Sequence, residues 1–274
     1  MRFLFWADRE SAKLSPLIES ARAEGIVPQP IGMGRTLGGD WGNTLFKQQA
    51  LFDAVQGLDD REIVCATDGF DVFFQQGAES MREKFLALDC EVVFSAERGY
   101  SHQYRAFKRF YDRGAGSSPY KYLNAGCVMG YAKALERLYR PSRLLRLQVD
   151  LARRPPLRRL LSRLPSTSRV RRRHRDEPAL DPVAYLRWFE YTDQAHLGRQ
   201  IARGRDDGVV TLDRDCTLFW CTAFEWEDVG EHCELVGGKL QNRHTGRTPA
   251  CIHVPWESRH RAVFEKLYES VHVK

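Results

Sequence analysis

The sequence contains no long hydrophobic run. Nowhere do about eighteen apolar residues follow one another, which is the least that a membrane-spanning helix needs. The apolar stretch 3–6 near the N-terminus is too short for a signal peptide, and charged residues follow it at once at positions 8–10. We therefore expect no transmembrane helix and no signal peptide, and we expect the first residues to form a strand.

The cysteines lack the spacing of a disulfide framework or a zinc site. Seven are scattered along the chain without a Cys-x-x-Cys pair, and several stand inside apolar runs. A cysteine in such a run behaves as a small hydrophobic residue. We expect reduced thiols in the core of a cytoplasmic protein.

Lysine is missing from residues 140–175, although this segment holds thirteen arginines and only one acid, Asp150. The whole chain has 42 lysines and arginines against 36 acids, so this segment supplies all of the net positive charge and the remainder is mildly acidic. We expect a single domain over residues 1–274, interrupted at 140–180 by an Arg-rich and partly disordered insertion. The insertion could bind an anionic membrane surface, and the protein would then lie at the inner membrane. It could equally bind an acidic partner or nucleic acid, or be a solvated tract without function.

Short apolar stretches alternate with helical patterns through the first half of the chain. Strands are expected over 3–7, 27–31, 63–66, 91–97, 122–131, 209–212, 216–220 and 250–254, with a hairpin over 231–241 that turns at Gly237-Gly238. Helices are expected over 11–24, from 43 or 44 to 55, and over 78–86, 102–113 and 181–189, with two more beginning at 191 and 257. This alternation predicts an α/β fold with a largely parallel sheet.

Two carboxylates follow the apolar strand 63–66. Asp68 and Asp71 are separated by Gly69 and Phe70, and ligands of open α/β sheets bind at the carboxyl ends of strands. Two neighbouring carboxylates repel one another unless a cation lies between them, which favours a divalent metal site. The alternative is an Asx-turn that only ends the strand.

Four more polar residues stand where a ligand could explain them. Lys47 lies in the first turn of a helix after a glycine-rich loop, where a cation is unusual unless it meets an anion. The alternative is a solvated surface lysine. Asn124 stands in a strand of small and apolar residues, where its amide needs a partner. Asp193 begins a helix and could simply cap it. His253 stands in the apolar strand 250–254, where a histidine is more often a satisfied core residue than a ligand.

A series of short motifs follows one another along the chain: Gly32-Met-Gly34 with Gly38-Gly39-Asp40 and Lys47, Thr67-Asp-Gly-Phe-Asp-Val72, Val92-Val-Phe-Ser-Ala-Glu97, Tyr122-Leu-Asn-Ala-Gly126, Thr192-Asp-Gln194, Leu212-Asp-x-x-Cys216 and the tail Pro249-Ala-Cys-Ile-His253. In this order they resemble the glycosyltransferase domain of the procollagen lysyl hydroxylase and glycosyltransferase family. The resemblance covers most of the chain outside residues 140–180.

The resemblance implies a GT-A fold with a Rossmann-type mixed, mostly parallel sheet flanked by helices. It implies Mn²⁺ or another divalent cation and a UDP-sugar donor, from which a hexose, galactose or glucose, passes to a hydroxyl acceptor such as hydroxylysine or a glycan. Asp68, Asp71 and His253 would hold the metal, which would bridge the diphosphate of the donor.

The resemblance also implies contacts with the donor and the acceptor. Phe70 would lie against the uracil ring, with Thr67 in the same motif. Lys47 and the loop through Trp41 would approach the nucleotide or the donor, and Asn124 would line the sugar pocket. Asp193 with Gln194 would face the donor sugar and the acceptor, Asp193 acting as a base for the hydroxyl or steadying positive charge on the sugar.

The sequence is compatible with two other functions. Where the family has at least two acids before the glutamine, this chain has Thr192 and Asp193, which favours a catalytically weak relative that binds nucleotide-sugar. A nucleic-acid-binding protein that uses the arginine segment is less favoured, because no aromatic residues interleave the arginines to stack on bases.

Overall fold

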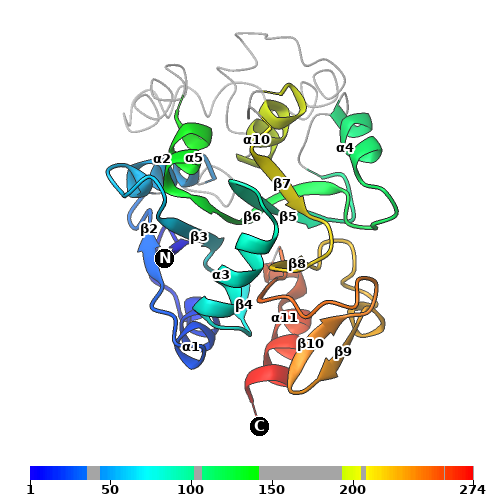
Figure 1. Cartoon of the computed structure of the whole chain (residues 1–274). Helices are drawn as coiled ribbons and strands as arrows, with labels where there is room; N and C mark the ends of the chain where they lie inside the picture. The colour runs from blue at the N-terminus through cyan, green and yellow to red at the C-terminus, as the bar shows by residue number, and fades with distance from the viewer. Residues whose placement is uncertain (36–43, 102–106, 142–192, 205–207, 256, 274) are drawn as a thin grey trace, which may run out of the picture.

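A computed structural model describes residues 1–35, 44–101, 107–141, 193–204, 208–255 and 257–273. Trp41, the expected helix 181–189 and most of the Arg-rich insertion lie outside the described residues. A six-stranded sheet forms the centre (Figure 1). Its strands in spatial order are β2 (Gln29–Ile31), β1 (Arg2–Trp6), β3 (Ile63–Asp68), β6 (Tyr122–Tyr131), β5 (Val92–Glu97) and β7 (Val210–Asp213).

Five strands of this sheet share one direction, and β6 runs antiparallel to both of its neighbours, β3 and β5. The continuous apolar sequences of β1 and β3 arise because both faces of the sheet are covered. Side chains alternate between the faces, so Phe3 and Cys65 enter one core while Leu4 and Val64 enter the other. The expected α/β architecture with a mixed, mostly parallel sheet is confirmed.

Helices lie on both faces of the sheet. The core with Phe3 receives α1 (Ser15–Ala23) and α3 (Ala78–Ala87). The core with Leu4 receives α2 (Thr44–Val55), α4 (Lys108–Gly114), α5 (Ala132–Tyr139) and α10 (Asp193–Ala202). In Figure 1, α2, α5 and α10 lie above the sheet and α1 lies below it. A short 3-10 turn, Ala12–Leu14, leads into α1, and Gly25, at φ +71, follows the end of that helix.

A second sheet continues the core that contains Phe3. Its order is β4 (Val72–Phe74), β11 (Cys251–His253) and β8 (Phe219–Cys221), with β11 antiparallel to β4 and parallel to β8. A 3-10 turn, Val229–Glu231, precedes the hairpin of β9 (Cys233–Val236) and β10 (Lys239–Asn242). The hairpin turns at Gly237 and Gly238, both with positive φ, as expected. The last helix, α11 (Glu257–His272), buries Phe264 against Phe73.

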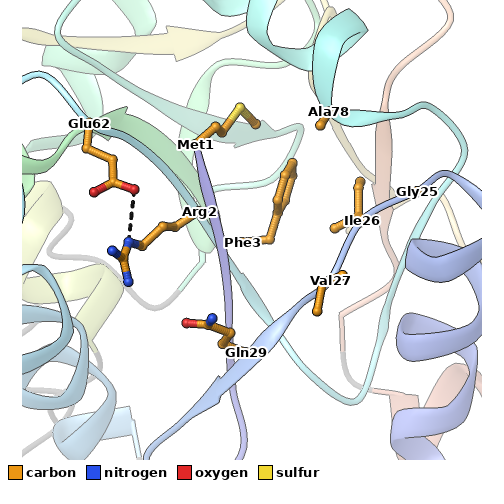
Figure 2. A pocket seen from close by; sticks show the side chains of 9 residues that line it. All are labelled: Met1, Arg2, Phe3, Gly25, Ile26, Val27, Gln29, Glu62 and Ala78. Carbon is orange, nitrogen blue, oxygen red and sulfur yellow. Dashed lines mark hydrogen bonds and ion pairs between the residues drawn. The ribbon is translucent and has the colours of Figure 1, made fainter.

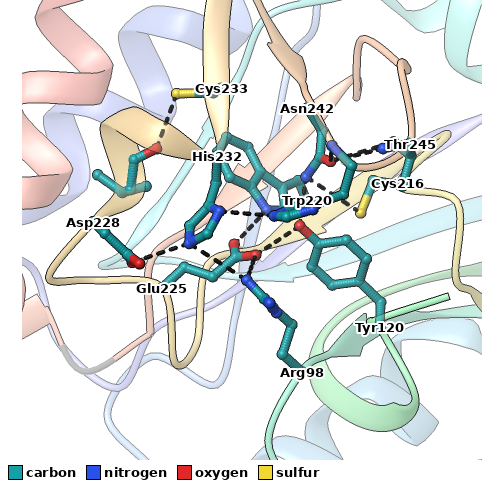
Figure 3. Close-up of polar contacts among 12 residues, drawn as sticks. Arg98, Tyr120, Cys216, Trp220, Glu225, Asp228, His232, Cys233, Asn242 and Thr245 are labelled. Carbon is teal, nitrogen blue, oxygen red and sulfur yellow. Dashed lines mark hydrogen bonds and ion pairs between the residues drawn. The ribbon is translucent and has the colours of Figure 1, made fainter.

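A buried polar network joins this C-terminal part to the main sheet (Figure 3). The carboxylate of Glu225 is fully buried and accepts hydrogen bonds from Tyr120 Oη and Trp220 Nε1, both at 2.8 Å. Arg98, directly after β5, forms an ion pair with Glu225 at 3.2 Å. The amide of Asn242 donates to Tyr120 Oη at 2.6 Å. Because a buried polar group needs its partners, the network fixes the C-terminal strands relative to β5 and β6.

Two strands begin later than expected for physical reasons. The expected strand 216–220 is β8 over 219–221, because Cys216 has φ +52 and Asp213 accepts the backbone N–H groups of residues 217–219 in a turn. The expected strand 27–31 shortens to 29–31, since Pro28 has no N–H and Val27 is 79% exposed. The strand Val72–Phe74 was not expected at all. The helix expected over 102–113 is described from Lys108 only.

The cysteines agree with the expectation of free thiols in the core. All seven cysteines are free thiols, and six of them are buried. In the described part of the chain, no helix combines the length and the apolar composition needed to cross a membrane.

Candidate functional site

The end of β3 and the pairing of β11 with β4 bring Asp68, Asp71 and His253 together. Asp68 is the last residue of β3, and Asp71 lies between β3 and β4. His253 ends β11, where it pairs with Val72 of β4, and the backbone N–H of Val254 donates to the carbonyl of Asp71 at 2.9 Å. The site thus forms where the carboxyl end of β3, in the six-stranded sheet, meets β4 and β11 of the three-stranded sheet.

These three side chains point one ligand atom each at a common point, with the atoms within 4.8 Å of one another. His253 Nε2 lies 3.5 Å from Asp71 Oδ1 and 3.7 Å from Asp68 Oδ2. Both His253 Nε2 and Asp71 Oδ1 are buried and have no hydrogen-bond partner among the described residues. Burial works to lower the pKa of His253, but Asp71, with Asp68 beyond it, outweighs burial and raises that pKa to about 9.

This donor set fits a divalent metal. Two carboxylates and one imidazole are common ligands of Mn²⁺ and Zn²⁺, and buried polar atoms without partners are costly unless something binds them. Without a metal, the alternative is a core ion pair between protonated His253 and Asp71, whose Nε2 and Oδ1 lie 3.5 Å apart.

Lys47 is buried in α2 and holds two carboxylates. Its ammonium lies 2.7 Å from Asp68 Oδ1, 3.3 Å from Asp193 Oδ2 and 2.8 Å from the carbonyl oxygen of Ala125. Burial works to lower the pKa of Lys47, but the two carboxylates outweigh it and hold the pKa far above its ordinary value. Lys47 is therefore a charged internal residue and not a solvated surface lysine.

Asp193 is the first described residue of α10, and its Oδ1 accepts the N–H of Gln194 at 2.9 Å. Its other oxygen faces Lys47 in the interior, so capping is only part of its environment. Burial raises the pKa of Asp193, against the opposing charge of Lys47. Asp193 is thus connected through Lys47 to the metal-type cluster.

An irregularity in β6 brings the backbone into the site. The ladder with β5 pairs Phe94 with Val128 and Ser95 with Asn124, so residues 125–127 are passed over. Freed from the ladder, Ala125 accepts from Lys47 through its carbonyl and donates its N–H to Gln194 Oε1 at 3.1 Å. The bulge therefore connects α2, β6 and α10 at one point.

Asn124, Gln194 and Glu97 form one buried hydrogen-bonded group. Glu97 accepts from Asn124 Nδ2 at 2.9 Å, from Gln194 Nε2 at 3.1 Å and from Ser101 Oγ at 2.5 Å. Asn124 Oδ1 lies 3.1 Å from His253 Nδ1. Burial raises the pKa of Glu97 to about 7, and its three donors reduce that rise.

The remaining predicted residues lie at the margin of the cluster. Thr67 is buried between β1 and β6, and its hydroxyl has no partner among the described residues. Phe70 is half-buried, and the guanidinium of Arg9 lies 5.5 Å from the centre of its ring. Trp41 is outside the described residues, so its position is not part of this geometry.

A second group of metal-type side chains lies outside this site. Glu225, His232 and His244 also bring metal-type atoms together, but Glu225 is satisfied by its donors in Figure 3, and His232 contacts both Asp228 and His244. The guanidinium of Arg98 also lies 3.2 Å from Glu225, where its positive charge disfavours the binding of a metal cation. This group is therefore complete as a hydrogen-bonded network.

A depression of about 440 Å³ lies at the opposite, amino-terminal end of β1 (Figure 2). An ion pair of Arg2 and Glu62 borders it, together with apolar side chains such as Phe3 and Ile26. The cluster of Asp68 is at the carboxyl end of the sheet, so this depression does not belong to it.

A family model described as PLOD GT domain matches residues 6–145, just over half of the 274 residues. The chain belongs to the PLOD GT domain family. The match includes Lys47, Asp68, Asp71 and Asn124 and stops before Asp193 and His253. In the structure, Asp193 contacts Lys47 and His253 contacts Asn124, so both later residues adjoin the matched part of the PLOD GT domain. Its mixed, mostly parallel sheet is the architecture that the GT-A resemblance implies.

Solved structures of glycosyltransferases also resemble this PLOD GT domain. The apo form of mouse xyloside xylosyltransferase 1 is 11% identical with a TM-score of 0.42, covering 93% of this chain and 98% of that one. A glycosyltransferase involved in the glycosylation of the major capsid of PBCV-1 is 12% identical with a TM-score of 0.43, covering 98% and 100%. An active-site mutant of LgtC is 12% identical with a TM-score of 0.45, covering 100% and 97%. No curated protein matches the chain. Family membership rests on the sequence match.

Glu97 and Gly126 are not among the residues that the sequence predicts for the site. Glu97 ends an otherwise apolar strand, and a buried acid at a strand's carboxyl end is the signal that could have marked it. Gly126 has a steric role, since a β-carbon there would lie 2.0 Å from His253 Cε1. Such a contact between distant residues leaves no local signal.

Proposed function

We propose that this PLOD GT domain transfers a hexose, galactose or glucose, from a UDP-sugar to a hydroxyl acceptor such as hydroxylysine or a glycan, with Mn²⁺ as the preferred metal. The observation that carries the proposal is the cluster of Asp68, Asp71 and His253, with two orphan ligand atoms, in a chain of this family. A divalent cation held by these residues would neutralise charge on the diphosphate and on the leaving UDP.

The chain's own residues have separable roles in this proposal. Lys47 holds Asp68 and Asp193 in place and brings positive charge to the edge where phosphates would bind. Asp193, buried and adjacent to that cation, would accept the proton of the acceptor hydroxyl or face positive charge on the sugar, with Gln194 beside it. The half-buried ring of Phe70 would contact the uracil, with Thr67, Trp41 and Asn124 near the donor.

Isothermal titration with UDP, in the presence and absence of Mn²⁺, tests the metal. Affinity should rise by at least about tenfold with Mn²⁺, because the diphosphate otherwise meets Asp68 and Asp71 unscreened. Asp71→Asn is nearly isosteric and should remove this gain, while Asp60→Asn, on an exposed carboxylate, should retain it. Equal UDP affinity with and without Mn²⁺ in the native chain would contradict the assignment of Asp68, Asp71 and His253 as metal ligands.

Measuring turnover distinguishes an active glycosyltransferase from a catalytically weak relative that binds nucleotide-sugar. Threonine at position 192, where the family has an acid, favours the weak relative as the second candidate. Metal-dependent UDP binding without hydrolysis of UDP-galactose or UDP-glucose, and without transfer to hydroxylysine peptides or glycans, would favour a nucleotide-sugar-binding protein.

A further inference from the structure

The amide of Asn124 lies between a buried carboxylate and a metal-type histidine. Its Nδ2 is 2.9 Å from Glu97 Oε2, and its Oδ1 is 2.9 Å from the N–H of Gly126 and 3.1 Å from His253 Nδ1. Asn124 is only 4% exposed. All of these contacts are internal, so the amide is occupied within the protein.

The two neighbours of Asn124 fix which way its amide points. The backbone N–H of Gly126 can only donate, so the atom that faces it must be the oxygen. The carboxylate of Glu97 accepts, so the atom that faces it must be the NH₂ group. Both constraints agree, and neither depends on His253 or on a metal.

The fixed amide in turn sets the state of the histidine ring. Since Asn124 presents an oxygen to His253 Nδ1, that nitrogen must carry a proton and donate. The proton that a metal displaces is therefore the one on Nε2, the atom that faces Asp68 and Asp71. Histidine ligands are commonly oriented through their second nitrogen in this way.

We propose that Asn124 is a positioning residue, held by Glu97, that keeps the Nδ1 proton on His253 and directs the lone pair of Nε2 toward Asp68 and Asp71. This inference rests on the proposed function, because it concerns the same metal site. It assigns to Asn124 a role in metal binding through His253 and to Glu97 a role in orienting Asn124.

Exchanging the two partners gives a sharp test. In the double variant Glu97→Gln with Asn124→Asp, the amide and the carboxylate trade places and the net charge is unchanged. The introduced amide would donate to the introduced carboxylate, which would still accept from the N–H of Gly126 and from His253. The oxygen of the introduced amide would still accept from Gln194 and Ser101. Every hydrogen bond of the group is therefore retained with one direction reversed.

The measurement is Mn²⁺ affinity of the full chain without nucleotide, from the electron paramagnetic resonance signal of free Mn²⁺. Asn124→Leu, similar in size but without polar atoms, should weaken affinity about 10- to 100-fold. Glu97→Gln alone should weaken it in the same direction, because the NH₂ group of the introduced glutamine must then face the amide donor of Asn124 or of Gln194. The exchanged pair should return to within about threefold of the native chain. Ser101→Ala, which removes only one donor to Glu97, is the matched control and should stay near native affinity.

Each outcome decides the matter. Native affinity in folded Asn124→Leu would overturn the positioning role while leaving the metal site intact. If Asn124→Leu does not fold, as judged by circular dichroism, the pair of Glu97→Gln and the exchanged variant decides. An exchanged variant as weak as Glu97→Gln, or a Glu97→Gln variant at native affinity, would overturn the proposal. A native chain that binds no Mn²⁺ would overturn the proposed function itself.

Discussion

The ring of His253 lies so close to Gly126 that a β-carbon at position 126 would be 2.0 Å from Cε1 of the ring. Gly126→Ala should therefore move the histidine and weaken Mn²⁺ affinity by about tenfold or more. Gly130→Ala, in the same strand, is a matched control because its β-carbon would meet the carbonyl of Glu91 at 2.8 Å, away from the site. Thermal melts and Mn²⁺ titrations of both variants separate the effects. Both should lose stability, and equal loss of Mn²⁺ affinity in both would contradict the local role of Gly126.

Lys47 should be a large determinant of stability because it neutralises two partly or fully buried carboxylates. Lys47→Met should cost about 3–5 kcal/mol in the free energy of unfolding, since it leaves Asp193 buried without a cation. Adding Asp193→Asn should recover part of that loss, because the stranded charge is then gone. Urea denaturation of the two single variants and the double variant gives the coupling.

An exposed lysine provides the comparison for Lys47. Lys133 pairs with Asp60 at 3.4 Å, but both side chains are more than half exposed. Lys133→Met should therefore change stability by less than about 1 kcal/mol. A similar small change in Lys47→Met would show that the buried ion pairs do not stabilise the fold.

Asp193→Asn should separate sugar transfer from nucleotide binding. Turnover should fall at least about a hundredfold, on the order expected for losing a positioned acid or base. Its affinity for UDP with Mn²⁺ should stay within about threefold of native, because Asp68, Asp71 and His253 are untouched. Steady-state kinetics and titration of the same preparations check this, with Asp60→Asn as the surface control. Normal turnover in Asp193→Asn would leave helix capping and the ion pair with Lys47 as its roles.

Glu97 should make stability depend on pH in the metal-free protein. Burial raises its pKa from the ordinary value of 4.5 to about 7. Between these values the folded state keeps a proton on Glu97 that the unfolded chain releases, so the contribution of Glu97 to stability is greatest below about pH 4.5 and falls as the pH rises toward 7. The free-energy difference between the native chain and Glu97→Gln should shift by about 3 kcal/mol in favour of the variant across this range. Denaturation at a series of pH values measures it. Glu79→Gln, at an exposed position, should show no such shift.

Local sequence predicted much of the fold because each strand carries its own pattern. The strand expected over 122–131 is β6 to the residue, and the hairpin turns at the expected glycines. Boundaries failed where a distant or backbone interaction decided them. β8 begins late because the carboxylate of Asp213 accepts hydrogen bonds from the backbone N–H groups at its start. No pattern of apolar residues predicts such a contact.

The residues of the site also differ in how far the sequence predicts them. Asp68 and Asp71 were predictable from a strand followed by carboxylates, and His253 from the family's order of motifs. The partners that organise them were not. Lys47 was predicted near the nucleotide, but its contacts with Asp68 and Asp193 depend on how α2 and α10 pack against β6. The place of Glu97 in the site likewise depends on Asn124 and Gln194 meeting across two elements.

The bulge of β6 makes chain length, and not only residue type, a constraint on this site. Residues 125–127 are extra relative to β5, so only the loss of all three would let the two strands pair evenly. A one-residue deletion between Asn124 and Val128 would turn the side chains on one side of it to the opposite face of the sheet. Asn124 would then point away from His253 although every other residue of the site kept its identity. Among homologous sequences, insertions and deletions should therefore avoid this short interval even where its side chains vary.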